Sequence, residues 1–443
     1  MDPVVAELLK FSRETQWENV SKEAKEEIKK RIMDSLITSY AAFGSAPVKI
    51  AMNALMPVNG RADSSVYFTG KRADPQVAAF INGTMTRYHD YNDTYLSKEA
   101  LHPSDNIPPI LALAESRGLG GKELMLSIAV SYGVIAGLAD AVCIRDLGWD
   151  HVTYISISSA AGMAHLLKLD LEKFESAISL AINNNISLRQ TRAGELSMWK
   201  GATAANACRN SMFGTLLAEK GMTGPYQIFT GEMGFFKQVS GPFDLRLDRN
   251  AVLRTMIKNF PVEYHSMSAA EVAVSLRQKI RSPIRMITIE TFSVAHKIIV
   301  KDPEKLRPRT KETADHSLPF IVAYSLLYGD PNIGSYSERY LKDEKILKLI
   351  DSTKIVVNSD YDKSYPSDLP VRITVETNEG TVSSEMRYPK GHYMNPYSWE
   401  DLRNKGEKVM EKSSYSAIES KIRNLEEIGV PELMEVVRNV KAD

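Results

Sequence analysis

The spacing of apolar residues changes at about residue 255, and this change constrains the fold more than any other feature. Before it, apolar side chains recur every three or four residues; Ile28, Ile32 and Leu36, for example, are spaced four apart. That spacing is typical of amphipathic helices. After it, segments that alternate apolar and polar side chains appear, and these indicate β-strands. The sequence therefore predicts a mainly α protein with an α+β part in its second half.

The first part is expected to contain long, closely packed helices. Asp74 followed by Pro75 is a start signal, because a capping carboxylate precedes a proline at the first helical position. Helices are expected over residues 22–43, 75–89, 121–144, 154–167, 171–183 and 198–220. The most apolar stretch, residues 124–142, carries Asp140 and several small residues, so we interpret it as a buried core helix and not as a membrane span.

The second part is expected to mix strands and helices. The expected strands cover residues 285–292 and 354–357 and a hairpin, 371–377 and 381–388, whose turn contains Asn378 and Gly380. Further helices are expected over residues 312–328, 337–350 and, in the tail, 399–440. We infer a large all-helical domain formed by residues 1–255 and 398–443. A smaller α+β lid domain, residues 256–397, is inserted before the C-terminal helices.

Composition narrows the class of protein. The 443 residues carry 55 basic and 55 acidic side chains, and a net charge of zero gives no support for a nucleic-acid or membrane partner. The two cysteines, Cys143 and Cys208, are too few for an iron–sulfur cluster or a cysteine-rich zinc site, and they fit a reduced compartment. The N-terminal residues lack a signal-peptide pattern, so a cytoplasmic location is expected.

Side chains capable of chemistry are densest between residues 88 and 105. The stretch holds three acids, two imidazoles, a hydroxyl and a lysine, namely Asp90, Asp93, Asp105, His89, His102, Thr94 and Lys98. A carboxylate beside an imidazole holds the tautomer of the ring and tunes its proton affinity, as general acid–base catalysis requires. Acids and imidazoles also ligate divalent metal ions, so proton transfer and metal binding both remain open at this point.

Three residues outside this stretch are further candidates. His151 stands at the expected start of a helix, where the helix dipole disfavours the protonated ring. Lys200 precedes a run of small residues and is a plausible anion clamp, although lysines usually lie on the surface. Lys258 marks the change of periodicity, and the surrounding residues by themselves favour an ordinary polar linker. We interpret the remaining histidines and the cysteines as structural or ordinary polar residues: His165, His296, His392, the Asp315-His316 pair, Cys143 and Cys208.

Several motifs taken together resemble the MmgE/PrpD family, the group of the 2-methylcitrate dehydratases. They are Tyr91-Asn-Asp-Thr-Tyr-Leu-Ser-Lys-Glu99, His102-Pro-Ser-Asp-Asn106, Gly148-Trp-Asp-His-Val-Thr153, Arg192-Ala-Gly-Glu-Leu-Ser-Met-Trp-Lys-Gly201, Gly221-Met-Thr-Gly-Pro225, Ala314-Asp-His-Ser-Leu-Pro-Phe320 and Pro389-Lys-Gly-His-Tyr-Met-Asn-Pro396. Each motif alone is weak, but together they span most of the chain in the family's order, which makes the resemblance specific.

The resemblance implies a fold, a reaction and a set of site residues. It implies a large helical domain with an α+β lid, an active site in the cleft between them, and a homodimer. The expected reaction is removal of water from 2-methylcitrate, a small tricarboxylate, without cofactor or metal, in propionate catabolism via the methylcitrate cycle. The implied residues are Asp90, Thr94, His102 and His151 as catalytic groups, and Lys200 and Lys258 as substrate-binding groups.

Other functions stay open. Within the family, the activity of a cis-aconitate decarboxylase or an epimerase is an alternative; a tyrosine of the decarboxylase's site aligns with Phe320 here, and this departure weakens that interpretation. A metal-dependent hydrolase would use His102, His151, Asp90 and Asp93, but no His-Glu-x-x-His motif supports it. A helical scaffold would leave the clustered acids and histidines unexplained. Which of His102, His151 and Asp90 acts as acid or base is undecided from the sequence.

Overall fold

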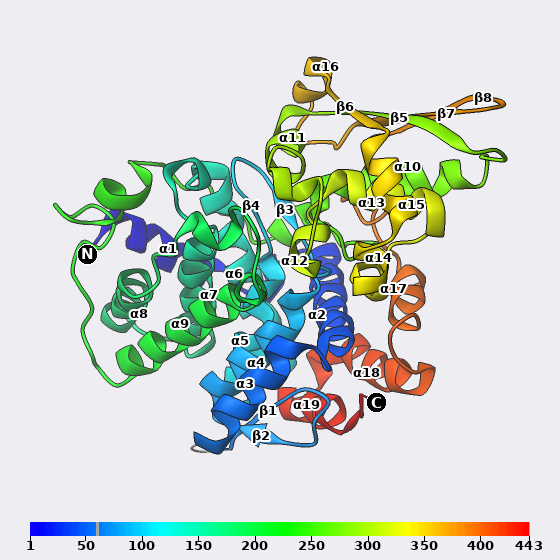
Figure 1. The fold of residues 1–443 in the computed structure, drawn as a ribbon. Coiled ribbons are helices and arrows are strands. Elements are labelled where there is room, and N and C mark those ends of the chain that lie inside the picture. The colour runs from blue at the N-terminus through cyan, green and yellow to red at the C-terminus, as the bar shows by residue number, and fades with distance from the viewer. Residues whose placement is uncertain (59–61, 443) are drawn as a thin grey trace.

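The computed structural model describes residues 1–58 and 62–442 and shows a helical body with a smaller α+β part at one end (Figure 1). The first half contains α1 (Pro3–Glu14), α2 (Lys22–Ala42), α3 (Ala46–Leu55), α4 (Pro75–Tyr88), α5 (Ile107–Ser116), α6 (Gly121–Ala141), α7 (Val152–Leu166), α8 (Leu171–Asn183) and α9 (Thr203–Glu219). A two-stranded hairpin, β1 (Ser64–Ser65) and β2 (Arg72–Ala73), interrupts them. The predicted fold class, mainly α with an α+β portion, is confirmed.

Helix α6 runs through the middle of the helical body. It is long and apolar enough to cross a membrane, but 83% of its most apolar window is buried inside the protein. It packs extensively against α7, and small residues permit the close approach: a Cβ atom at Gly162 of α7 would lie 3.0 Å from the carbonyl oxygen of Ser127 of α6. The predicted buried core helix is therefore confirmed.

The second half is built on a four-stranded sheet. Its strands, in the order β6-β5-β7-β8, are β6 (Thr353–Val357), β5 (Ile284–Thr291), β7 (Val371–Thr377) and β8 (Gly380–Met386). The β5–β6 pair is parallel, and the other pairs are antiparallel. The larger helices of this part are α10 (Met267–Arg277), α13 (Leu318–Tyr328) and α15 (Glu344–Asp351). They share one apolar core with Ile287, Ile289 and Ile373 of the sheet, and the predicted strands and hairpin are confirmed.

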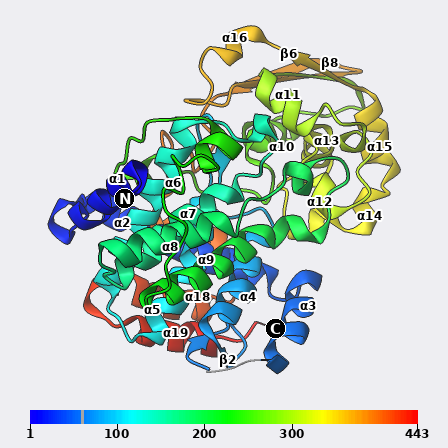
Figure 2. The same cartoon turned by 90° about the vertical axis from the view of Figure 1, so that its left-hand side faces the viewer.

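The helix α11 (Ser293–Ile299) lies between the sheet and the helical body. Figure 2 shows the sheet at the upper end of the molecule, with α11 below it. Lys297 of α11 donates a hydrogen bond of 2.8 Å to Asp146 of the helical body. This helix therefore brings the α+β part against the first half of the chain.

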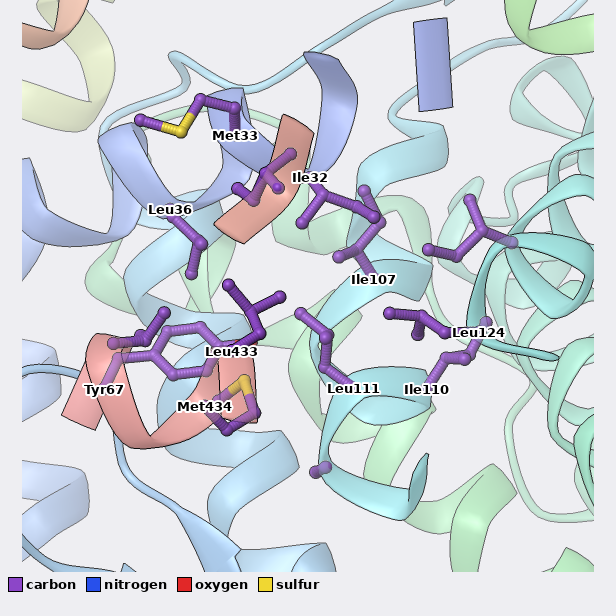
Figure 3. Close-up of a cluster of buried hydrophobic side chains, with 14 of the residues drawn as sticks. Ile32, Met33, Leu36, Tyr67, Ile107, Ile110, Leu111, Leu124, Leu433 and Met434 are labelled. Carbon is purple, nitrogen blue, oxygen red and sulfur yellow. The ribbon is translucent and has the colours of Figure 1, made fainter. Parts of the chain in front are cut away.

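The C-terminal tail returns to the helical body. Its helices are α17 (Trp399–Gly406), α18 (Lys412–Arg423) and α19 (Val430–Asn439), and they pack on α2 and α5. Figure 3 shows Leu433 and Met434 of the tail in one apolar cluster with Ile32 and Leu36 of α2. The proposed domain boundaries near residues 255 and 398 stay a prediction.

Three expected helices are interrupted in the structure. Residues 312–328 form α12 (Lys311–Ala314) and α13, because the Ser317 side chain caps α13 and Pro319 stands in its first turn. Residues 337–350 form α14 (Glu338–Leu341) and α15, which Asp343 caps. Residues 198–220 begin with a 3₁₀ turn, Met198–Gly201, before α9. The short helix α16 (Ser359–Asp362) was also not expected.

Candidate active site

The predicted residues gather at a cavity of about 370 Å³ between the helical body and the α+β part. From the helical body it is lined by Arg87, Asp90, Thr94, Leu96, Glu99, Ala100, Leu101, His102, Arg145, Asp146, His151, Arg189, Arg192 and Ala193. From the α+β part it is lined by Glu263, Tyr264, His265, Val294, Lys297, Ile298, Lys301, Asp302, Lys305 and His316. Larger hollows of about 450 and 480 Å³ have other linings, without any of the six predicted site residues.

The segment after α4 folds back on itself and brings its functional side chains together. Asp90 has a φ of 51°, a left-handed conformation that aspartate tolerates better than most residues. Thr94 pairs with Met256 through two backbone hydrogen bonds of 2.8 Å. An unexpected hairpin, β3 (Tyr95–Leu96) with β4 (Ala100–Leu101), then returns the chain. As a result, His102 Nδ1 lies 3.4 Å from Thr94 Oγ1, and His102 Nε2 lies 3.7 Å from Asp90 Oδ1.

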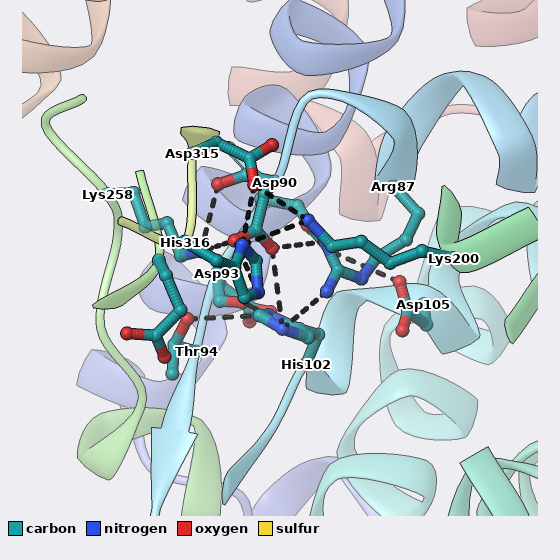
Figure 4. A network of polar contacts seen from close by, with 12 residues as sticks. Arg87, Asp90, Asp93, Thr94, His102, Asp105, Lys200, Lys258, Asp315 and His316 are labelled. Carbon is teal, nitrogen blue, oxygen red and sulfur yellow. Dashed lines mark hydrogen bonds and ion pairs between the residues drawn. The ribbon is translucent and has the colours of Figure 1, made fainter. Parts of the chain in front are cut away.

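Asp90 is buried among positive charges, as Figure 4 shows. Arg87 pairs with its Oδ1, and Lys258 Nζ lies 3.2 Å from its Oδ2. Burial alone would raise the pKa of this carboxyl group, but Arg87 and Lys258 hold the pKa well below its usual value. Asp90 therefore stays a carboxylate at neutral pH and is a fixed negative charge beside the cavity.

His102 has both ring nitrogens engaged by the protein. Nδ1 lies 2.7 Å from the carbonyl oxygen of Asp93, which can only accept, so Nδ1 carries the proton. Nε2 accepts a hydrogen bond of 2.9 Å from Arg87 Nη2. Burial, followed by the charge of Arg87, lowers the pKa of His102 well below its usual value. This histidine is neutral, and its lone pair is already in use.

His151 differs from His102 in having a free lone pair. Its Nδ1 lies 3.3 Å from Asp150 Oδ1, and Asp150 also pairs with Arg192 at 2.8 Å. Its buried Nε2 has no hydrogen-bond partner within the described residues. The ring lies edge-on to that of His102, with centroids 5.8 Å apart and an interplanar angle of 63°. Burial and then Arg192 lower the pKa of His151 well below its usual value, so the ring is neutral and able to accept a proton.

The two predicted lysines lie directly behind the cavity wall. Lys258 Nζ donates to the carbonyl oxygens of Asp90 at 2.8 Å and Val262 at 3.1 Å. Lys200 Nζ donates to Asp315 Oδ1 at 3.0 Å and lies 3.2 Å from His316 Nδ1. Burial lowers the pKa of Lys200 to about 8. Both ammonium groups therefore contact protein atoms, and their direct binding of a substrate stays a prediction.

Positive charge from both parts of the chain surrounds the cavity. The cationic side chains of its lining are Arg87, Arg145, Arg189, Arg192, Lys297, Lys301 and Lys305. Burial lowers the pKa of Arg189, and the neighbouring guanidinium groups of Arg192 and Arg145 lower it further, against the effect of Asp150. Like charges this close are stabilised by an anion, so the arrangement suits a ligand with several carboxylates. In the sequence analysis Arg192 appeared only within a family motif, and the other six cations were not identified as site residues.

The interpretation of His316 as an ordinary polar residue was wrong, because His316 lines the cavity. Its Nδ1 lies 2.5 Å from Asp315 Oδ1, and its Nε2 lies 4.0 Å from Asp90 Oδ2. Burial and then Lys200 lower its pKa to about 4. The available signal was the helix-start pattern of Ser317 and Pro319, which places His316 in a turn before α13 and not within a helix.

The acids and histidines do not form the metal site considered from the sequence. Asp93 faces away from the cavity, because it accepts from the Ser104 backbone N–H at 2.9 Å and from the Tyr132 hydroxyl at 2.8 Å. Among described residues, ligand atoms with metal-like spacing belong to Asp90, Asp315 and His316. Their carboxylates are already paired with four cationic side chains, Arg87, Lys258, Lys200 and Lys311. A divalent cation would have to displace these charges, so the donor set does not favour a metal.

Both halves of the chain match models of one family. The model of the MmgE/PrpD N-terminal domain matches residues 6–248, and that of the MmgE/PrpD C-terminal domain matches residues 260–428. The chain therefore belongs to the MmgE/PrpD family.

Known relatives are named as dehydratases. A 2-methylcitrate dehydratase of Escherichia coli (strain K12) is 28% identical over 72% of this chain and 71% of its own length. A mitochondrial 2-methylcitrate dehydratase of Yarrowia lipolytica is 28% identical over 73% of this chain and 68% of its own. An alkylcitrate dehydratase of a fungal species is 27% identical over 76% of this chain and 73% of its own length. Dehydratases of this kind are hydro-lyases, and the protein is an enzyme of the lyase class.

Proposed function

We propose that the protein removes water from 2-methylcitrate to give 2-methyl-cis-aconitate. The observation that carries the proposal is the unpartnered Nε2 of neutral His151, on the wall of a cavity surrounded by cations. A proton on a carbon next to a carboxylate is weakly acidic. Its removal needs a positioned base and positive charge near the developing anion. Both are present in this cavity.

His151 is the base in this proposal. It takes the proton from the carbon next to a carboxylate onto Nε2, and Asp150 stabilises the imidazolium through Nδ1, 3.3 Å away. His102 is less suited to this role, because Arg87 already donates to its Nε2. Asp90 and His102 instead hold the positively charged guanidinium group of Arg87 in place, through an ion pair and a hydrogen bond. Thr94 orients the substrate through its hydroxyl group.

The leaving hydroxyl group needs a proton, and Lys200, whose ammonium group Asp315 holds, supplies it in this proposal. Lys200 Nζ lies 3.2 Å from His316 Nδ1, and its pKa of about 8 leaves it protonated but a moderately strong acid. Lys200 gives one ammonium proton to the departing hydroxyl group, which leaves as water, and Lys200 remains as a neutral amine beside Asp315. Asp90 is not the acid, because its pKa is held well below its usual value.

An apolar patch on the cavity wall fits the methyl substituent. Leu96 and Ala100 from the helical body and Val294 and Ile298 from α11 line the cavity, and they pack into the same apolar core. Val294 and Ile298 are four residues apart and so share one face of α11. A patch of this kind favours an alkylated citrate over citrate, since each buried methylene contributes about 0.8 kcal/mol.

A product assay tests the proposal. Protein freed of metal is mixed separately with 2-methylcitrate, citrate and cis-aconitate, and the conjugated double bond is followed by ultraviolet absorbance and NMR. We expect 2-methyl-cis-aconitate from 2-methylcitrate. Release of carbon dioxide from cis-aconitate without dehydration would instead identify a decarboxylase. Activity that requires an added divalent metal would overturn the mechanism.

A further inference from the structure

A buried ion pair connects the C-terminal tail to the site. Lys405 of α17 and Asp34 of α2 are each 1% exposed, and Nζ lies 2.6 Å from Oδ1. The ammonium group also donates to the backbone carbonyl oxygens of Tyr91 at 3.1 Å and Lys258 at 2.9 Å. These three hydrogen bonds use all the donors of a lysine, so the group holds its partners in one arrangement.

Both carbonyl groups belong to the segments that carry the site. Tyr91 follows Asp90, whose left-handed backbone turns the chain toward the cavity. Lys258 in turn binds the carbonyl oxygen and the carboxylate of Asp90. Lys405 thus holds the backbone of Lys258, and the Lys258 side chain holds Asp90. The backbone pairing of Thr94 with Met256 joins the same two segments a few residues away.

We propose that Lys405, kept charged by Asp34, is a positioning residue: it fixes residues 90–94 and 256–262 so that the Asp90–Arg87–His102 group faces the substrate. Lys405 is not among the residues that line the cavity, so it acts through its two carbonyl partners. The kinetic test of this inference rests on the dehydration proposed above. A second readout below is independent of the reaction.

Lys29 offers a matched control. It is also a buried lysine of the interface between α2 and the tail, and its Nζ lies 2.7 Å from Glu426 Oε2 and 3.0 Å from the Arg423 carbonyl oxygen. None of its partners belongs to the site segments. Replacing either lysine by methionine removes a buried charge and keeps the length of the side chain, so both variants are expected to melt at a lower temperature than the wild type.

The experiment compares Lys405→Met, Lys405→Arg and Lys29→Met below their melting temperatures, with 2-methylcitrate as substrate. We expect Lys405→Met to lower kcat about 10- to 100-fold with little change in KM, because a small displacement of catalytic groups is costly. Lys405→Arg, which keeps the charge, should recover part of the loss. Lys29→Met should stay within about twofold of the wild type. Equal losses in the two methionine variants, or none in either, would overturn the proposal.

Hydrogen exchange supplies the readout that does not depend on turnover. Amides of residues 88–95 and 256–262 should exchange faster in Lys405→Met than in Lys29→Met or the wild type. Unchanged protection of both segments would refute the positioning role. If the wild type does not dehydrate 2-methylcitrate, the proposed function fails, and the exchange comparison still decides whether Lys405 positions these segments.

Discussion

The two walls of the cavity are built in different ways. On the helical side, Arg87, Asp90, His102 and His151 are buried, and most of their polar atoms are held by other protein groups. On the α+β side, Lys297 of α11 is 59% exposed and Lys301 is also exposed. A rigid, desolvated wall is where proton transfer is efficient, and long exposed cations attract and hold a charged ligand. The comparison assigns the proposed proton transfers by His151 and Lys200 to the first wall, and the attraction of a charged ligand to the exposed Lys297 and Lys301 of the second.

The largest expected effect is on the helical wall. His151→Ala should lower kcat by about 10²- to 10⁴-fold, because a general base is lost. His165→Ala is the matched control, since His165 is also a partly shielded histidine, bonded to Ser12 at 3.0 Å, but lines a different hollow. Steady-state kinetics of both variants decide the point. A loss of only a few-fold in His151→Ala would remove it as the base.

The apolar patch lies on both walls of the cavity, so one substitution on each wall tests where the alkyl substituent binds. Ala100→Leu should fill the space for the substituent and lower kcat/KM for 2-methylcitrate relative to citrate by about 10-fold or more. Val294→Ala, on the opposite wall, should improve the relative use of longer 2-alkylcitrates. Val382→Ala is a control, because Val382 packs against the same core without lining the cavity. An unchanged substrate ratio in both cavity variants would place the substituent elsewhere.

The pH dependence tests the role of Lys200 on the helical side. If its ammonium group is the proton source, kcat should fall about tenfold per pH unit above pH 8. The free energy of unfolding should not fall together with kcat over this pH range. The pKa of Lys200 is lowered by folding, so between about pH 8 and 10.5 the unfolded chain binds more protons. The contribution of Lys200 to the free energy of unfolding therefore rises with pH. Unfolding midpoints that fall in parallel with activity would contradict the assignment.

The smallest effects are expected on the α+β wall. Lys297→Ala should raise KM a few-fold, leave kcat nearly unchanged and make KM less sensitive to salt. Its exposed pair with Asp146 should contribute only about 0.2–1 kcal/mol to stability. Kinetics at low and high ionic strength measure the effect on KM, and thermal melts of the variant and the wild type measure the contribution to stability. A large drop in kcat would show that this wall takes part in the chemistry.

Much of this architecture could be predicted because its signals are local. Long periodic segments identified helices such as α2 and α6, and the β7–β8 hairpin followed from alternation around a turn with Asn378 and Gly380. Asp90, Thr94 and His102 were found together because they lie within thirteen residues. Local capping was underestimated at Ser317, and the expected helix over residues 312–328 was therefore wrong.

The rest of the site depends on contacts between distant parts of the chain. The buried partner of Lys200 is Asp315, 115 residues away, and nothing near either residue identifies the pair. The same holds for Lys405, whose partner Asp34 is 371 residues distant. The free lone pair of His151 is a property of the packed site, since His102, an equally good candidate in the sequence, has its lone pair occupied by Arg87.

The return of the tail to α2 also sets the order in which the protein can be assembled during synthesis. At roughly 5–20 residues per second, the ribosome adds the residues between Asp34 and Lys405 in about 20 to 75 s. Throughout that time, the face of α2 that later packs against α17 and α18 is without these two native partners. The nascent chain therefore exposes part of the apolar surface of α2 for most of its translation. If Lys405 positions the segments around Asp90 and Lys258 as proposed, these segments reach their final arrangement only when α17 has been made.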